Sequence, residues 1–176
     1  MKKFLLIASL IVSTTIAFAQ KNTSQSYIEK FKGNAVRIMH ESGVPASIVL
    51  AIAMHESGNG NSKIARTMNN HFGMKGRSST SYTGNKRVHS SYRQYDSDED
   101  SFQDFARIMT QRKQFSHLGD KFTHYDYLGW VKGIQRSGYA SSKLWGAQVL
   151  GIIRKYKLNN YDEKPEEQPH PAKNVE

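Results

Sequence analysis

The sequence predicts a mainly α-helical domain with a small β insertion. Apolar residues recur at helical spacing through most of the chain, and one glycine- and serine-rich stretch, 69–95, interrupts that pattern with short β-prone pieces. The 176 residues are 38% hydrophobic, which is enough for one core. A charged share of 23% with 11% aromatic residues argues against a fully disordered chain.

The first three helices follow from spacing and from their end residues. A helix is expected over Tyr27–Glu41, with Gly43 ending it in a left-handed conformation. The next, Ala46–Glu56, is apolar on almost every side, and such a helix is expected to be buried. A short third helix is expected over Ser62–Met68, with Ser62 as its N-cap.

The second half begins with a hairpin or irregular β-lobe, for which Ser81–Thr83 and Arg87–Tyr95 are the β-prone pieces. Ser97 and Asp100 then have the spacing of a capping box and open a helix. Two further helices are marked by apolar residues expected to face inward: Tyr127, Leu128, Val131 and Ile134 in one, and Leu144, Ala147, Leu150 and Ile153 in the other.

The first nineteen residues have the three parts of a signal peptide. A basic start precedes the apolar stretch Phe4–Val12, and Ala17-Phe18-Ala19 is a small-x-small cleavage signature. The apolar stretch is shorter than the roughly 20 residues of a membrane span, which is the competing interpretation. We therefore expect cleavage after Ala19, no stable membrane insertion afterwards, and a periplasmic or secreted protein.

The remaining boundaries follow from composition. Residues 20–26 are expected to be a short linker, residues 27–157 the domain, and residues 158–176 a disordered tail, because the tail is acidic and holds three of the four prolines. The absence of cysteine excludes disulfides, thiolate zinc sites and a cysteine nucleophile. We expect a monomer.

The charge is strongly positive and unevenly placed. The formal net charge is +10, and no acid lies between Ser57 and Tyr95. A basic stretch of this kind favours a polyanionic partner, although a merely soluble surface explains it equally well. Export makes nucleic acid an unlikely partner, so we expect none.

Glu56 is the sharpest chemical feature. It ends the apolar helix one turn after Ile52, and the glycines that follow leave room for a bulky polymer beside it. Apolar surroundings favour the protonated form of a carboxyl group, which a general acid for glycosidic cleavage requires. The alternative is a helix-end glutamate that makes a cap or a surface ion pair.

The sequence contains no motif for the other common catalytic chemistries. His55-Glu56 lacks the second histidine of a zinc helix, because position 59 is Asn, and no serine-nucleophile or phosphate-binding glycine motif is present. We expect no metal and no cofactor. Several aromatic residues could stack on sugar rings in a groove or simply belong to the core: Phe72, Tyr82, Tyr92, Tyr95 and Tyr139.

Taken together, the motifs over residues 27–157 resemble the bacterial glucosaminidase domain, glycoside hydrolase family 73. Their order and spacing carry the resemblance, since each one alone is weak. The motifs are Gly43–Ile48, Ala51–Gly58, Ser62–Ala65, Asn69–Gly76, Tyr92–Ser97, Ser101–Phe105, Gly138–Ala140 and Tyr156–Leu158.

The resemblance implies a lysozyme-like helical domain with a small β-lobe, and an exported endo-β-N-acetylglucosaminidase that cleaves peptidoglycan glycan strands after N-acetylglucosamine. It implies that Glu56 is the general acid and that Tyr139 lies in the active site. Asn70, Phe72 and Lys75 become candidate substrate contacts, and Tyr95 joins them as an aromatic neighbour of the groove.

One departure from the family affects the chemistry. Members often carry a second acid in the β-lobe, whereas residues 76–94 hold none. Asp96 is the nearest candidate in sequence, and Asp104 matches a family position on a helix. Alternatively, the 2-acetamido group of the substrate assists, or the protein binds wall without cleaving it. A lytic transglycosylase also uses a Glu-Ser pair, but the Gly-Leu-Met-Gln type of segment is missing.

Overall fold

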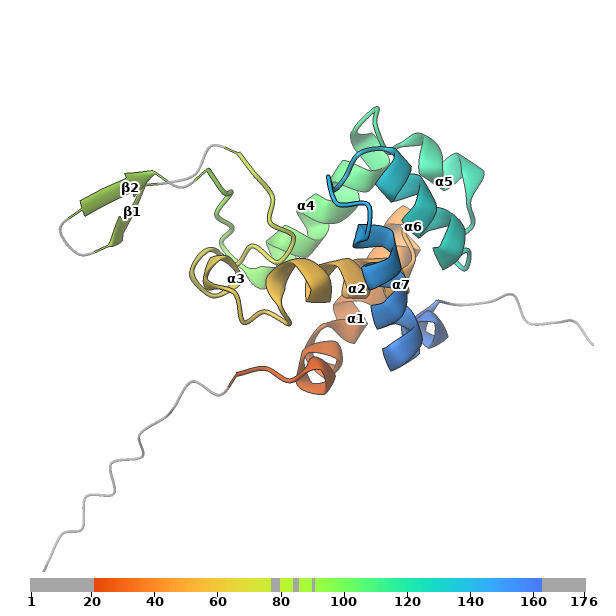
Figure 1. Ribbon diagram of the computed structural model, residues 1–176, viewed down its shortest axis with the longest axis horizontal. Coiled ribbons are helices and arrows are strands. Elements are labelled where there is room, and N and C mark those ends of the chain that lie inside the picture. Colours follow the sequence, from red (N-terminus) through yellow and green to blue (C-terminus); the bar gives the residue numbers. More distant parts are fainter. Residues whose placement is uncertain (1–20, 77–79, 84–85, 90, 163–176) are drawn as a thin grey trace, which may run out of the picture.

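The computed structural model describes residues 21–76, 80–83, 86–89 and 91–162, with backbone alone for the two strands. Within this part the protein has seven α-helices, a hairpin and a final 3-10 helix (Figure 1). The elements are α1 (Ser24–Ser42), α2 (Ala46–Ser57), α3 (Lys63–Met68), β1 (Thr80–Thr83), β2 (Lys86–His89), α4 (Asp98–Gln111), α5 (His117–Lys121), α6 (Tyr127–Arg136), α7 (Trp145–Tyr156) and η1 (Leu158–Tyr161).

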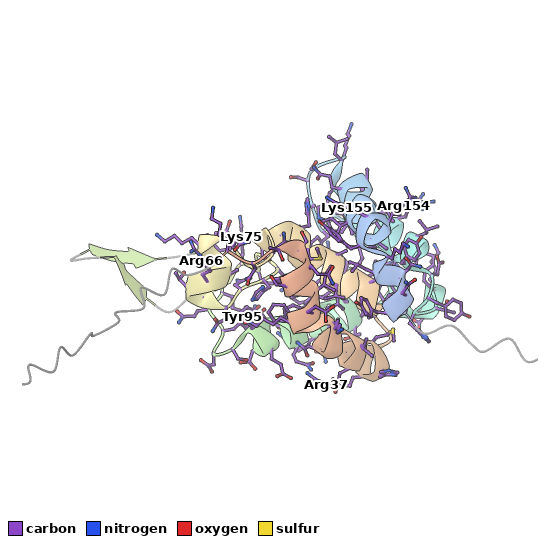
Figure 2. The ribbon with its side chains drawn as sticks, turned by 90° about the horizontal axis from the view of Figure 1, so that it is seen from below. Arg37, Arg66, Lys75, Tyr95, Arg154 and Lys155 are labelled. Atoms are coloured by element: carbon purple, nitrogen blue, oxygen red, sulfur yellow. The ribbon has the colours of Figure 1, made fainter. Side chains whose placement is uncertain are left out.

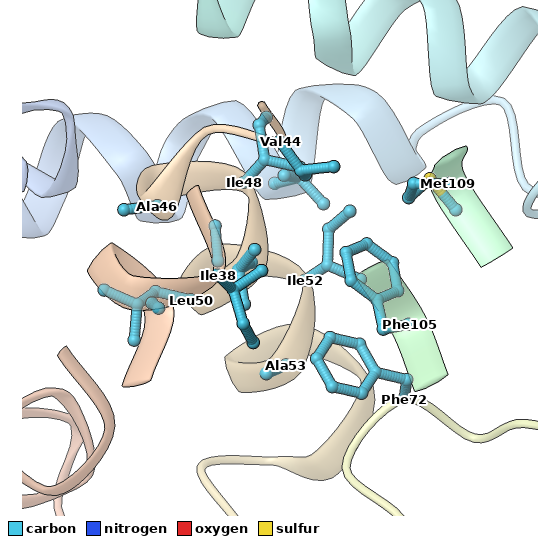
Figure 3. Packing of buried hydrophobic residues seen from close by; sticks show 14 of the residues in the cluster. Ile38, Val44, Ala46, Ile48, Leu50, Ile52, Ala53, Phe72, Phe105 and Met109 are labelled. Atoms are coloured by element: carbon cyan, nitrogen blue, oxygen red, sulfur yellow. The ribbon is translucent and has the colours of Figure 1, made fainter. Parts of the chain in front are cut away.

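Helix α2 forms the centre of the core. Every residue from Ala46 to Met54 is buried, as its uniformly apolar sequence predicts. The helices α1, α4, α6 and α7 and the 3-10 helix η1 all contact it. Figure 3 shows Ile52 of α2 between Ile38 of α1 and Phe105 of α4, with Ile48 beside Val44. The buried helix fixes the position of Glu56 at its carboxyl end.

Side-chain caps set most helix starts. Ser62 accepts a hydrogen bond from the Ala65 amide, and Ser97 forms a reciprocal capping box with Asp100, as predicted for both. Helix α1 begins three residues earlier than the predicted Tyr27, because Thr23 and Ser26 form a second capping box. The predicted linker 20–26 therefore includes the first turn of α1.

The mainly helical class is confirmed. The strands β1 and β2 pair antiparallel, with Thr80 opposite His89 and Thr83 opposite Lys86. This hairpin projects away from the helices (Figure 1), and its base is closed by a bridge between Lys75 and Tyr92. That the hairpin corresponds to the β-lobe of a lysozyme-like fold stays a prediction.

Three features of the second half differ from the sequence prediction. In α6, Val131 and Ile134 are buried as predicted, but Leu128 is 39% exposed. Helix α5 is only five residues long, and its one buried residue, Leu118, gave no periodic signal. In α7 the prediction was correct for Ile153 but wrong for Leu144 and Ala147, which are exposed. Trp145, Val149 and Ile153 are buried, whereas Leu144 is 67% exposed. The face is set by Trp145, whose ring reaches inward to the end of α2.

Ordered structure continues past the predicted start of the tail. Leu158 is fully buried, and both carboxylate oxygens of Asp162 bind Ser47 at the start of α2: Oδ1 accepts from the backbone N–H at 2.9 Å and Oδ2 from the hydroxyl at 2.6 Å. Pro45, the N-cap of α2, makes no side-chain cap of its own. Asp162 therefore supplies the cap, and the placement of the tail from residue 158 was too early.

The predicted signal peptide lies outside the described residues, as does the chain from 163 onward. None of the helices in the described part of the chain is both long and apolar enough to span a bilayer. Export and cleavage after Ala19 stay predictions.

Shortening the chain tests the role of Asp162. A chain ending at Lys157 loses the buried Leu158 and the cap on α2, and we expect it to unfold with a free energy lower by about 3 kcal/mol than the full chain. Urea unfolding followed by circular dichroism measures the difference. A chain ending at Glu163 is the control and should match the full chain. Equal stability of all three chains would contradict the role given to Asp162.

Candidate active site

The backbone turns sharply directly after Glu56. Gly58, Asn59 and Gly60 all have positive φ angles, between 57° and 74°. Ser57 is buried, and its hydroxyl donates to the Ala53 carbonyl at 2.6 Å and accepts from the Gly60 N–H at 2.7 Å. A side chain at Gly60 would meet the Tyr27 ring at 3.0 Å, so this position requires glycine. The Glu-Ser-Gly motif thus ends the buried helix and brings Glu56 to the surface.

Glu56 is half-buried and held by one hydrogen bond from the far end of the chain. The indole N–H of Trp145, at the start of α7, donates to Oε1 at 2.9 Å. Trp145 is itself buried, so the donor is fixed in place. Trp145 was not predicted from the sequence, because the helical spacing placed the neighbouring Leu144 on the inward face instead. The pairing of α2 with α7 therefore orients the predicted general acid.

Glu56 faces an open groove of about 460 Å³. Four segments form its walls: the end of α2, residues 72–75, the end of α4 with the turn after it, and residues 138–145. Glu56 is the one carboxylate among the described residues that line it. Its other lining residues are His55, Phe72, Gly73, Met74, Lys75, Ile108, Arg112, Gln114, Phe115, Gly138, Tyr139, Ala140, Ser141, Ser142 and Trp145.

Tyr139 lies in the same groove, as expected. Its ring packs against Trp145, with centroids 5.2 Å apart, and edge-on against Phe105 and Phe115. The hydroxyl oxygen is buried and has no hydrogen-bond partner among the described residues. Burial, and to a smaller degree the charge of Glu56, raises the pKa of Tyr139 well above its ordinary value. The hydroxyl therefore stays protonated, beneath the surface of the groove.

Two of the predicted substrate contacts line the groove. Phe72 is buried and stacks on Phe105 at 4.3 Å, so most of its ring belongs to the core beneath the groove. Lys75 is exposed, with its ammonium 6.0 Å from the centre of the Tyr92 ring. Lys75 is thus the cation on this wall that a substrate can reach.

Asn70 has a different environment from the predicted one. It is 1% exposed and outside the groove lining. Its amide donates to the carbonyls of Met74 and Arg93, at 2.9 and 2.7 Å, and accepts from the Met74 N–H at 3.0 Å. The prediction of a substrate contact is not supported, because these bonds instead fold the loop that carries Phe72 and Lys75.

A network of polar side chains around the buried His71 anchors the loop that carries Phe72 and Lys75. His71 bonds the Tyr27 hydroxyl through Nδ1 and Asp98 through Nε2, each at 2.8 Å. Lys30 pairs with the other oxygen of Asp98, also at 2.8 Å. The hydrogen bond to His71 leads the causes that lower the pKa of Asp98 to about 2. This network of side chains links α1, the loop and the start of α4.

Tyr95 and Asp104 belong to a second anchoring cluster. The Tyr95 hydroxyl donates to Asp104 Oδ2 at 2.6 Å, and Arg93 and Arg107 both pair with the same carboxylate. Burial acts to raise the pKa of Asp104, but these hydrogen bonds and charges together lower it. Neither Tyr95 nor Asp104 lines the groove, so the structure does not support Tyr95 as a substrate contact.

Asp96, the predicted partner acid, is exposed and is not among the lining residues of the groove. Its backbone carbonyl accepts from the Asn69 side chain at 3.1 Å. The structure therefore does not bring a second carboxylate from this segment to Glu56. Within the described residues there is also no group of three potential metal-binding side chains.

A carboxyl group and a protonated phenol in an open groove, on a mainly helical fold, are the elements of a glycoside hydrolase that works by acid catalysis. The chain belongs to the glucosaminidase family. The sequence pattern of that family, described as mannosyl-glycoprotein endo-beta-N-acetylglucosaminidase, matches residues 32–158. The predicted family and enzyme class are confirmed.

Relatives agree with this assignment. The chain is 28% identical over 155 residues to the exo-glucosaminidase LytG of Bacillus subtilis, which covers 79% of this chain and 54% of the relative. The chain thus spans about half of the length of that protein.

Solved structures share the fold. The catalytic domain of the autolysin Auto from Listeria monocytogenes has a TM-score of 0.65 at 22% identity, covering 83% of this chain and 92% of the domain. A peptidoglycan hydrolase from Sphingomonas sp. A1 has a TM-score of 0.60 at 24% identity, covering 78% of this chain and 92% of that one.

Replacing Asp104 tests whether it is structural. Asp104→Asn leaves two guanidinium groups without their carboxylate, and we expect a loss of about 2 kcal/mol in the free energy of unfolding at pH 7. Because folding lowers the pKa of Asp104, this stabilisation is present at neutral pH and lost in acid. Urea unfolding at pH 7 measures it. The exposed Asp96→Asn is the control, and equal stability of the two variants would refute the structural role.

Proposed function

We propose that the protein is an exported peptidoglycan hydrolase that cleaves the glycan strand after N-acetylglucosamine, with Glu56 as its general acid. The observation that carries the proposal is the position of Glu56, the single carboxylate of the described groove lining, fixed by the Trp145 N–H. The family assignment and a fold shared with a peptidoglycan hydrolase support the substrate. The strongly basic chain also suits a wall polymer that carries carboxylates.

The groove favours participation of the substrate in the reaction. Residues 57–95 contain no acid, so the hairpin cannot supply a second carboxylate. In the mechanism that we propose, Glu56 gives its proton to the glycosidic oxygen while that oxygen leaves the anomeric carbon. The carbonyl oxygen of the 2-acetamido group forms a new bond to the same carbon, which gives a cyclic oxazolinium ion.

The second half of the reaction reverses these roles. Water attacks the anomeric carbon, Glu56 takes up the proton that the water loses, and the oxazolinium ring opens to restore the acetamido group. The two inversions give net retention of configuration. Tyr139 lines the same groove, and its hydroxyl is protonated, buried and without a hydrogen-bond partner among the described residues.

Products released from purified peptidoglycan test the bond and the acid together. Wild type should release fragments that end in reducing N-acetylglucosamine, and Glu56→Gln should be slower by at least about a hundredfold. Mass spectrometry of the soluble fraction gives both results. Glu29→Gln is the matched control, because Glu29 forms an exposed ion pair with Lys32 on α1, away from the groove.

Each alternative gives a different product. Anhydro-muramic acid ends would identify a lytic transglycosylase, and free N-acetylglucosamine as the sole product would identify an exo-acting enzyme, as the name of the LytG relative states for that protein. Retention on the wall without any released sugar would identify a binding module. This is the second interpretation, and the lack of a second carboxylate in the described groove lining favours it.

The stereochemistry of the product tests participation of the acetamido group. We expect the β-anomer to form first, and a thiazoline analogue of N-acetylglucosamine to inhibit wild type, because the analogue resembles the cyclic intermediate. Proton NMR of early product measures the anomer. Asp96→Asn should keep kcat within about threefold, since its side chain lies outside the groove lining. An initial α-anomer would show inversion and contradict the mechanism.

A further inference from the structure

A second groove begins where the catalytic groove ends. His55 lines both, and α7 runs from one to the other: Trp145 is in the catalytic groove, while Gln148, Ile152 and Lys155 line the second. These positions are three or four residues apart and therefore share one face of the helix. We call this second cavity, about 570 Å³ in volume and bounded by α2, α7 and the start of α1, the α7 groove.

The lining of the α7 groove combines an apolar floor with polar groups and a cation. Met54 and Ile152 are apolar, Asn59 and Gln148 carry amides, and Lys155 is exposed. No carboxylate lines the cavity among the described residues. Amides can pair with a peptide backbone, small apolar side chains fit an apolar floor, and an ammonium group binds carboxylate. This chemistry matches a short anionic peptide.

The same lining is less suited to a sugar ring. Tyr156 is its one aromatic residue among those described, and the Lys155 ammonium lies 5.2 Å from the centre of that ring. The Tyr156 hydroxyl donates to Ser24 Oγ at 2.8 Å. An aromatic ring that already faces a cation of its own chain, and whose hydroxyl is engaged, offers little surface for stacking on a saccharide.

We propose that the α7 groove binds the peptide stem of a wall strand whose glycan lies in the catalytic groove. Lys155 pairs with a stem carboxylate, and Gln148 and Asn59 bind the stem backbone. The proposal rests on the proposed function, because it places the substrate's glycan beside Glu56. It adds that the enzyme selects strands that carry peptide.

The groove offers two substitutions with matched controls. A side chain added at Gly151 would meet nothing within 4 Å, so Gly151→Trp fills the cavity without a clash at its Cβ, and Gly151→Ala leaves it open. Lys155→Glu reverses the cation of the groove. Arg154→Glu makes the same change in net charge one residue away, at an exposed position outside the lining (Figure 2).

The experiment compares cleavage of intact glycan strands with cleavage of strands whose stems an amidase has removed. Wild type should have a KM about tenfold lower for strands that carry stems, as one charge-assisted contact predicts. Gly151→Trp and Lys155→Glu should lose that preference and keep wild-type kinetics on stripped strands. Gly151→Ala and Arg154→Glu should keep the preference. Urea unfolding of each variant establishes that it is folded.

Two results would overturn the proposal: equal KM values of wild type on the two substrates, or equal effects of Lys155→Glu and Arg154→Glu. Equal loss on both substrates in Gly151→Trp would show that the groove binds glycan instead.

A binding measurement separates this inference from the proposed function. Titration of isotope-labelled Glu56→Gln with the free stem peptide should shift the amide NMR signals of Gly151 and Lys155. Shifts at these residues without hydrolysis by wild type would contradict the proposed function and support the peptide site. Hydrolysis without such shifts would support the proposed function and contradict the peptide site.

Discussion

The complete burial of α2 is the constraint on which the rest of the structure depends. A helix that is apolar on all sides is stable in water only when other elements cover it all round, and α1, α4, α6, α7 and η1 do so. Its carboxyl end must then leave the core, because Glu56 would be costly to bury without a partner. The Ser57 bonds and the left-handed backbone at Gly58 provide that exit. The buried central helix thus carries the acid.

Three other carboxylates that are buried or half-buried serve the scaffold. Asp98 and Asp104 fix the base of the hairpin to α4, and Asp162 caps α2 from the end of the described chain. Each is held by several donors, which makes a buried or half-buried carboxylate tolerable and the surrounding loops rigid. This division leaves Glu56 as the carboxylate of the described groove lining. It is the physical basis for the proposal that the substrate supplies its own nucleophile.

Local signals predicted much of the fold. The apolar spacing of α1 and α2 and the Ser62 and Ser97 caps depend on neighbours within one or two turns, and the structure confirms them. The face predicted for α6 is confirmed only in part, because Leu128 is exposed. Contacts between distant segments gave no such signal. Trp145 reaches Glu56 from 89 positions away and Asp162 reaches Ser47 from 115, so neither the face of α7 nor the end of the domain could be inferred from spacing.

The sequence by itself determined the buried helix and the acid at its end, because a continuous apolar run followed by Glu-Ser-Gly predicts a buried helix that ends at a turn, and the ordered set of motifs indicated the family. Tertiary structure decided which polar residues face the groove. Asn70 and Tyr95 have side chains that could bind sugar, but their partners are backbone carbonyls and Asp104, brought together by folding. A polar side chain satisfied inside the protein is unavailable to a ligand, and only the folded arrangement determines which ones are satisfied.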